Sequence, residues 1–476
     1  MLSVQKHLNY LLLAVTCGFL FTACGGDDSS NTAVIAPPAV TTQPVSATVA
    51  SGTSTTLSVV ATGESLSYQW YRDGTAVSGA TSATYTAAVA GSYYVVVTNS
   101  AGAAQSSAAT LTVTVSSGGT NTADVVSAAN AFLATLSSTQ KTVATSSTSA
   151  TTVLFQYTLA NAIQWSNLPG GRHGLRLNTA TLSEAQLTAA NAVIAAALGT
   201  AGQIMMAEVR LSDDVVAASQ ANSSSGSGLY SIAFIGTPSV TNPWLLQLTG
   251  HNLAYNITYN AMVSATPMFI GAEPPNWTVN TNGSYTISNN ASSSGTAHAP
   301  LETQRQAMFN LAEAIQADAS TAAVGKLTGT FSDVVMGVSN NGDSNFKTLT
   351  YPTFARGVSY TSLGTSQKTL VKTAIRAWVN TQASDIASTL LGIYESDAHL
   401  NATYIGYAVG RNGTKADFGA YPNAQANPLE SENSYIRIDG PRVWIEFVVQ
   451  AGVAYPGYVH YNSLWRDKIA DYGGSF

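Results

Sequence analysis

Two runs of alternating apolar and polar residues near the C-terminus meet at residues 439–442 (DGPR), and this pattern predicts a β-hairpin. A four-residue loop there would place Arg437 opposite Trp444 and Tyr435 opposite Glu446. Because side chains alternate across a strand, one face of the hairpin is apolar. This face consists of Ile436, Ile438, Val443, Ile445 and Phe447. The hairpin therefore has to lie in a sheet with that face against a core.

The other face of the hairpin is polar and aromatic, and it is the strongest candidate for a functional site. It carries Tyr435, Arg437, Trp444, Glu446 and Gln450. If residues 458–464 form a further strand, His460 and Asn462 share a face as well. Charged residues are only 9% of the chain, against roughly 25% in an average soluble protein. This concentration of ionisable groups predicts that the polar face lines a concavity.

The overall length and charge limit the architecture and the partners. At 476 residues the chain is too long for one ordinary domain. The net charge is −6 and the isoelectric point is about 5.5, with no stripe of Lys and Arg. We therefore expect no nucleic-acid partner.

Residues 1–23 have the pattern of a lipoprotein signal peptide. The apolar run 11–21 is too short to span a bilayer comfortably and follows a basic start. It leads into Thr-Ala-Cys at 22–24, which resembles the lipobox of bacterial lipoproteins, although Phe21 departs from the usual aliphatic residue. A plain secretory signal and a single membrane anchor are the alternatives.

The lipobox resemblance implies that the mature chain begins at a lipid-modified Cys24 and is attached to a membrane through it. Gly25 rather than Asp follows this Cys, which favours the outer membrane of the cell envelope, on either of its sides. Residues 24–38 are rich in Ser, Asn and Pro and are expected to form a flexible tether.

Residues 39–115 alternate as short strands with glycine-containing turns and resemble a bacterial immunoglobulin-like domain. Trp70 matches the core tryptophan and Tyr93 the tyrosine corner. Val59 and Val95 occupy the positions of the disulfide, so packing alone should hold this sandwich. We expect a spacer, with a ligand-binding module as the alternative, followed by a Gly/Ser linker at 116–123.

Residues 124–476 predict a separate α+β domain with a mostly antiparallel sheet. Helical patterns occupy 124–141, 182–220, 301–317 and 362–394. Strand patterns occupy 152–165, 230–270, 403–409 and the C-terminal hairpin. The strands come in groups rather than in regular βαβ alternation, which favours antiparallel pairing.

The sequence contains none of the motifs GxSxG, HExxH, CxxC, Walker A or the dinucleotide fingerprint. This argues against the commonest serine hydrolases, zinc proteases, thiol redox proteins and nucleotide-dependent enzymes.

Several short signatures follow one another through the second domain. In order they include LPGGRHGL, LTGHNL, GAEPP, LETQRQA, YIRIDGP, WIEF, HYNSLWRD and DYG. Together they resemble the family called domain of unknown function 3500 over about residues 124–473. In the pattern of that family, histidines are usual where this chain has Asn252 and Asn462. The family has no established activity, so the resemblance implies the domain and not the reaction.

Two histidine pairs and a carboxylate would suit Zn, Cu or Fe, which makes a divalent transition metal the candidate cofactor. This chain has one histidine of each pair, His251 and His460, with Glu446 and Glu273 as carboxylate candidates. Because Asn is only a weak ligand, such a site would have too few donors. The alternative for His251 is a buried, hydrogen-bonded imidazole in an unbroken strand.

The leading hypothesis is hydrolysis or oxidation of a small or polymeric extracellular ligand in an aromatic-lined pocket. Glu446 would act as general base or metal ligand, His460 as acid/base or ligand, and Arg437 or Arg466 would anchor an anionic group. The further ligand-binding candidates are Trp244, Tyr435, Trp444, Asn462 and Asp467. The alternative is a non-catalytic binding or scaffold protein, in which Arg–carboxylate pairs only lock the chain end.

Overall fold

The computed structural model describes residues 35–50, 55–72, 74–77, 79–87, 91–114, 121–144, 148–166, 168, 173–220, 224–280, 282–288, 296–328, 331, 334, 336, 343–408 and 434–476. Cys24, the predicted signal peptide and most of the predicted tether and linker lie outside these residues. The chain divides into two compact units. The smaller unit includes Thr56–Thr86 and Gly91–Thr110, and the larger unit includes Leu111–Phe476. The predicted boundaries at 39, 115 and 123 remain predictions.

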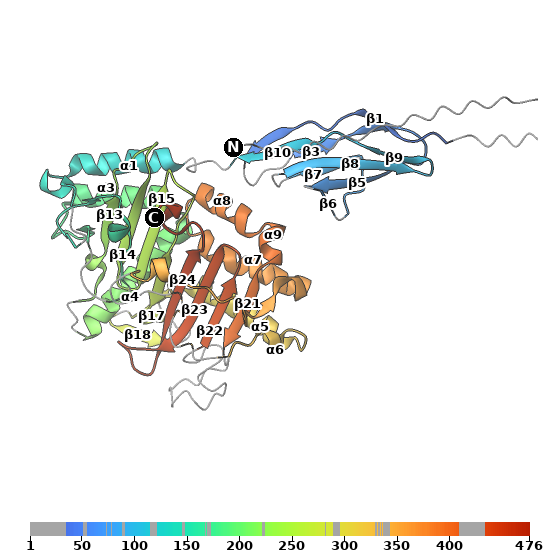
Figure 1. Cartoon of the computed structure of the whole chain (residues 1–476). Helices are drawn as coiled ribbons and strands as arrows, with labels where there is room; N and C mark the ends of the chain where they lie inside the picture. Colours follow the sequence, from blue (N-terminus) through green and yellow to red (C-terminus); the bar gives the residue numbers. More distant parts are fainter. Residues whose placement is uncertain are drawn as a thin grey trace, which may run out of the picture. The chain divides into compact units, whose positions relative to one another are not determined.

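The N-terminal region is built of short strands (Figure 1). They are β1 (Ala39–Thr42), β2 (Ala47–Ala50), β3 (Thr55–Ser58), β4 (Val60–Thr62), β5 (Ser67–Arg72), β6 (Thr75–Ala76), β7 (Thr84–Ala87), β8 (Gly91–Asn99), β9 (Gly102–Gln105) and β10 (Ala109–Thr114). One sheet has the order β2-β10-β8-β5-β6 with β9 beside β8, and β1–β4 and β3–β7 form two further pairs. Trp70, Tyr93, Val59 and Val95 are all buried here, as expected for a sandwich held by packing.

An 11-stranded sheet forms the centre of the larger unit (Figure 1). Its strands are β11 (Leu154–Phe155), β12 (Leu175–Arg176), β13 (Ser231–Ile235), β14 (Trp244–Gly250), β15 (Leu253–Tyr259), β16 (Met268–Ala272), β20 (Val358–Ser359), β21 (Tyr404–Ala408), β22 (Ser434–Asp439), β23 (Val443–Ala451) and β24 (Val459–Asp467). The order is β11-β13-β14-β15-β16-β24-β23-β22-β21-β20, with β12 beside β13. The β11–β13 pair is parallel and the other pairs in this sheet are antiparallel, which confirms the predicted class.

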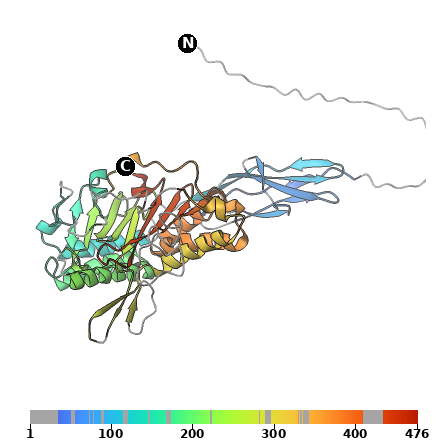
Figure 2. The same ribbon diagram turned by 90° about the horizontal axis from the view of Figure 1, so that it is seen from below.

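Helices cover one face of this sheet, and Figure 2 shows the long helices side by side in one layer beside it. They are α1 (Asn121–Thr135), α3 (Glu184–Ala197), α4 (Thr200–Gln220), α5 (Glu302–Ala317), α6 (Ala322–Gly325), α7 (Thr365–Val379), α8 (Ser384–Tyr394) and α9 (Asp397–Asn401). The short α2 (Leu159–Ala162) lies on the other face, where Ala162 packs with Ala233 and Ile235 of β13. The main hydrophobic core lies between these helices and the sheet, where Phe309 of α5 and Trp378 of α7 meet Phe447 of β23. The apolar face of the predicted hairpin belongs to this core.

Three expected elements differ from the structure. The helix predicted at 124–141 begins at Asn121 and ends at Thr135, and only a short 3-10 helix at Thr139–Lys141 follows. The strand predicted at 152–165 is limited to β11, because Thr158 caps a short helix by accepting a hydrogen bond from the Asn161 N–H. The single helix predicted at 362–394 is interrupted, since α7 ends at Val379 and α8 begins at Ser384.

A smaller sheet of β17 (Asn276–Val279), β18 (Tyr285–Ser288) and β19 (Thr296–His298) projects outward past the helical layer (Figure 2). Within the described ranges, none of the helices combines the length and the apolarity that crossing a bilayer would need.

Candidate functional site

The predicted hairpin is formed by β22 and β23, with a tighter turn than expected. The Gly440 N–H donates to the Val443 carbonyl at 2.8 Å, so Pro441 and Arg442 alone make the turn. Arg437 consequently lies opposite Glu446, which differs by two residues from the predicted register. Because the difference is even, every side chain stays on its predicted face.

The polar face of the hairpin is packed rather than open. Tyr435, Trp444 and Glu446 are fully buried and Arg437 is 4% exposed. The Phe331 ring stacks on Tyr435 with a centroid distance of 4.4 Å. The expected concavity at this position is thus filled by side chains of the chain itself.

Glu446, the predicted general base, is held by hydrogen-bond donors of the protein. One of its oxygens accepts from the Tyr435 hydroxyl at 2.6 Å and the other from the Met336 N–H at 3.0 Å. Its partner across the strands, Arg437, donates to the carbonyls of Ala355 and Arg356 at 3.4 and 3.2 Å. Both ionic side chains therefore stabilise the packing of this face.

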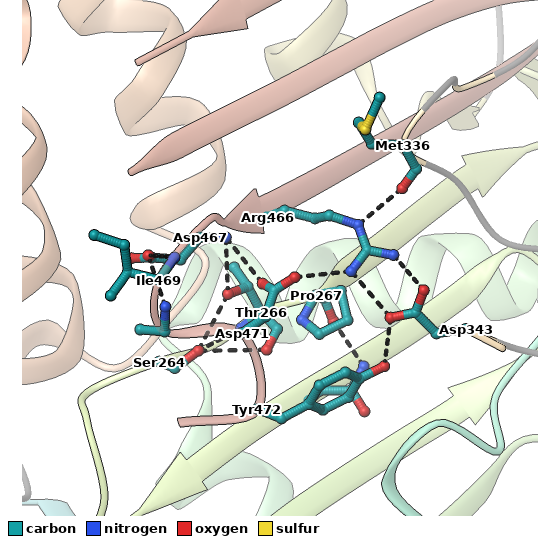
Figure 3. A network of polar contacts seen from close by, with 12 residues as sticks. Ser264, Thr266, Pro267, Met336, Asp343, Arg466, Asp467, Ile469, Asp471 and Tyr472 are labelled. Atoms are coloured by element: carbon teal, nitrogen blue, oxygen red, sulfur yellow. Dashed lines mark hydrogen bonds and ion pairs between the residues drawn. The ribbon is translucent and has the colours of Figure 1, made fainter. Parts of the chain in front are cut away.

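Arg466 lies at the centre of a buried network (Figure 3). Its guanidinium contacts Asp343 at 2.5 Å and Asp471 at 2.7 Å and donates to the Met336 carbonyl at 2.8 Å. The Tyr472 hydroxyl donates to Asp343 at 2.8 Å. Burial raises the pKa of Asp471 to about 6, although the Arg466 charge opposes this shift. The Arg466 guanidinium is thus bound to groups of its own chain and is not available to an anionic ligand.

Asp467 and Trp244 point to the helical side of the sheet. Asp467 accepts from Arg442 at 2.6 Å and from the Tyr394 hydroxyl at 2.8 Å. Trp244 stacks on Tyr259 at 4.6 Å within the main core. The structure does not bring either residue to His460.

A second group of polar residues gathers at one end of the sheet, where β14, β16 and β23 end and β15 and β24 begin. We call it the histidine cluster, and it consists of His251, Asn252, Glu273, His460 and Asn462. Four of these positions belong to the two histidine pairs of the expected family pattern. The predicted residues that the structure does bring together are therefore His251, Glu273, His460 and Asn462.

The turn between β14 and β15 positions His251. Gly250 pairs with Leu253, so His251 and Asn252 form a two-residue turn instead of continuing the strand. Asn252 has a φ of 58°, a left-handed conformation that Asn adopts more readily than most residues. A Cβ at Gly250 would lie 2.2 Å from the Tyr230 ring, whose hydroxyl donates to the His251 carbonyl at 2.5 Å.

His251 forms an oriented pair with Asp213 of α4. The distance between His251 Nδ1 and Asp213 Oδ1 is 2.7 Å, and the other Asp213 oxygen accepts from the Gly226 N–H at 2.7 Å. A carboxylate at Nδ1 fixes the tautomer and leaves Nε2 for chemistry. Sequence reasoning missed Asp213, although its spacing from Val209 and Val216 puts it on the buried side of α4.

His460 is buried beside this pair and is 8% exposed. Neither of its ring nitrogens has a hydrogen-bond partner among the described residues. Burial lowers the pKa of His460 to about 3, and the nearby charge of His251 acts in the same direction. The imidazole is therefore neutral at physiological pH.

Glu273 faces His460, with its carboxylate 3.4 Å from Nδ1. Its other oxygen accepts from the N–H groups of Ala454 and Tyr455 at 2.7 and 2.9 Å. Burial raises the pKa of Glu273, opposed by these backbone donors and by His251.

Gly271 makes room for the two asparagines of the cluster. A Cβ there would lie 2.6 Å from Asn462 Oδ1 and 3.0 Å from Asn252 Oδ1. The two amide oxygens therefore approach the same point, where the family pattern would place imidazoles.

The predicted metal set of His251, His460 and Glu446 is not assembled. Glu446 pairs with Leu464 while Gln450 pairs with His460, so about 13 Å of strand separates the carboxylate from the histidine. No three or more His, Cys, Asp or Glu side chains in the described part of the chain are arranged to hold a metal ion. The acidic neighbour of His460 is Glu273 instead.

Comparisons with known proteins identify a family. The family described as "Protein of unknown function (DUF3500)" matches residues 118–474. No curated protein matches the chain. Among solved structures, the I-band fragment I67-I69 from titin is 28% identical over 17% of this chain and 34% of its own length, with a TM-score of 0.16. A chimeric titin Z1Z2 is 30% identical over 17% of this chain and 99% of its own, with a TM-score of 0.15.

Proposed function

The chain belongs to the DUF3500 family of proteins of unknown function, and we propose that its α+β region is a general acid–base enzyme, a hydrolase, centred on His251. The observation that carries the proposal is the His251–Asp213 pair, with a contact of 2.7 Å, beside the buried imidazole of His460, whose ring nitrogens make no hydrogen bond among the described residues. An unpaired polar group in a buried position costs free energy, so its retention favours a functional role.

The roles follow from the environments of the three groups. His251 Nε2 would take a proton from a water molecule, whose oxygen then forms the new bond to the substrate, and Asp213 would stabilise the resulting imidazolium. A neutral imidazole can donate a hydrogen bond to a developing oxyanion, which suits His460. Glu273, with its raised pKa, would donate a proton to the leaving group.

The substrate is expected to be polar but uncharged. Arg437 and Arg466 were predicted to anchor an anionic group. Arg437 instead donates to backbone carbonyls, and Arg466 pairs with carboxylates of its own chain. Near the cluster the groups are carboxylates, amides and imidazoles, which would disfavour an anion. An uncharged ester, amide or glycoside fits this balance better.

A panel of chromogenic esters, amides and glycosides tests the proposal. We expect His251→Gln to lower kcat for any substrate that wild type hydrolyses by about 10²–10⁴-fold, the usual contribution of general acid–base catalysis. Asp213→Asn should lower kcat and change the pH profile, since the imidazole loses its orienting carboxylate. His399→Gln is the matched control, because His399 contacts Ser396 outside the cluster. Full turnover by His251→Gln would refute the assignment.

The second candidate is ligand binding without chemistry. It is favoured by the asparagines at 252 and 462, because an amide cannot transfer protons as the histidines of the family pattern could. A ligand found by thermal shift that is not turned over, and that binds equally to wild type and His251→Gln, would support it.

We also propose that the protein is exported and attached to the cell envelope through a lipid on Cys24, with the immunoglobulin-like region as a spacer. The sequence pattern of residues 1–24 supports this. Cys24→Ser should abolish incorporation of labelled fatty acid and release the protein from the membrane fraction. Unchanged labelling of this variant would contradict the proposal.

A further inference from the structure

A groove of about 650 Å³ lies in the helical layer, between α4, the start of α5 and α7. Its buried lining residues include Met205, Pro300 and Ala307, which form an apolar floor. Ile204 lines the groove as well and is 59% exposed, which is unusual for a large aliphatic side chain. The volume lies within the range of small-molecule sites, about 300–1,000 Å³.

The sequence signature LETQRQA at residues 301–307 supplies one wall of this groove. Thr303, Gln304 and Gln306 line it from the first turns of α5. The histidine cluster does not use this signature. The signature LETQRQA therefore belongs to the groove and not to the proposed acid–base site.

Glu208 of α4 provides the groove with a carboxylate held in a fixed position. His298 Nδ1 contacts both carboxylate oxygens, at 3.0 and 3.1 Å. The His298 ring is in turn stacked on Trp277, with a centroid distance of 5.0 Å and an interplanar angle of 9°. Glu208 remains 24% exposed, so a ligand can reach it.

The lining carries one carboxylate, Glu208, and one guanidinium, Arg376, and the two have different partners. The Arg376 guanidinium is already matched by a bidentate pair with Glu395, with both contacts at 2.6 Å. The partner of the Glu208 carboxylate is the His298 imidazole, so this carboxylate is not matched by a permanent cation such as Lys or Arg. A ligand complementary to this groove carries a positive charge next to an aliphatic part.

We propose that this groove binds a small aliphatic ammonium compound. The ammonium group contacts the Glu208 carboxylate, and the alkyl part packs against Ile204 and Met205. The site is independent of the proposed hydrolysis, because none of its groups belongs to the histidine cluster.

Titration calorimetry with three six-carbon probes tests the proposal on the full chain. Hexylamine, 1-hexanol and hexanoate share the alkyl chain and differ in the head group. We expect hexylamine to bind at least tenfold more tightly than 1-hexanol, and hexanoate to bind more weakly than either. Absence of hexylamine binding, or equal affinities for hexylamine and hexanoate, would overturn the proposal.

Variants then locate the binding. Glu208→Gln should weaken hexylamine at least tenfold and leave 1-hexanol unchanged, whereas Glu313→Gln, an exposed position of α5 outside the groove, should change neither. Ala201→Trp fills the groove from an exposed lining position and should weaken both probes. Unchanged hexylamine affinity in Glu208→Gln or Ala201→Trp would place binding elsewhere. His251→Gln should bind hexylamine normally, so failure of the acid–base proposal leaves this test intact.

Discussion

Replacing Arg466 with Met tests whether this guanidinium stabilises the fold or acts on a ligand. Arg466 is fully buried and contacts Asp343 at 2.5 Å and Asp471 at 2.7 Å. Methionine keeps much of the volume but leaves two buried carboxylates without their cation. Removing one partner of a buried ion pair costs about 3–5 kcal/mol. We expect the free energy of unfolding of the larger unit to fall by about that amount.

The matched variant removes the three charges together, as Arg466→Met with Asp343→Asn and Asp471→Asn. A buried ion network can often be replaced by neutral groups at little cost, so this variant should recover most of the lost stability. Urea denaturation followed by tryptophan fluorescence suits the measurement, because every tryptophan except Trp70 lies in the larger unit.

Two results would refute the reasoning. One is an unchanged unfolding midpoint for Arg466→Met together with loss of hydrolysis or ligand binding, which would make Arg466 a functional residue after all. The other is a triple variant no more stable than the single one, which would mean that the unpaired carboxylates are not the cause of the loss.

Three further predictions concern buried ionisable groups. Glu446→Gln should lower the free energy of unfolding by about 1–3 kcal/mol, because it places an amide N–H beside the Tyr435 hydroxyl and the Met336 N–H, which are donors. Turnover should stay unchanged, and lost turnover at normal stability would contradict this prediction. Burial raises the pKa of Asp471 from 3.8 to about 6, so the folded state binds this proton at a higher pH than the unfolded state does. The free energy of unfolding should therefore rise as pH falls from about 6 to 4. In urea titrations, Asp471→Asn should not show this rise. Burial lowers the pKa of His460 from 6.5 to about 3, so the unfolded state binds a proton at a higher pH than the folded state does. The free energy of unfolding should therefore fall below pH 6.5, by up to about 1.4 kcal/mol per pH unit. His460→Gln should be less sensitive to acid in the same titration.

The fold could be predicted wherever apolar periodicity was long and regular. The helices at 182–220 and 301–317 and the strands at 230–270 all appear, because each carries one apolar face against the main core. The failures are local. The segment 152–165 is dominated by side-chain hydrogen bonds of Thr158 and Asn161 that periodicity does not reveal.

The site was predicted less well, for a reason that lies in the sheet. Alternation fixed which side chains of β22 and β23 share a face, but it could not show that both faces are covered. The aromatic side chains that close the polar face, Phe331 and Tyr351, lie far from the hairpin in sequence. Asp213 was not predicted as a site residue for the same reason, because its contact with His251 joins a helix to a turn that is distant in sequence.

The strand order has a consequence for the folding of the chain. β16 lies beside β24 in the middle of the sheet, although β17 to β23 separate them in sequence. While the chain folds, the half-sheet from β11 to β16 therefore presents an unpaired edge until β24 pairs with β16. Such an edge can pair with another chain, and long-range pairing of this kind is slow. Before β24 pairs with β16, this edge is therefore a place where another copy of the chain could bind, and a holding chaperone that covered it would raise the yield of folded protein.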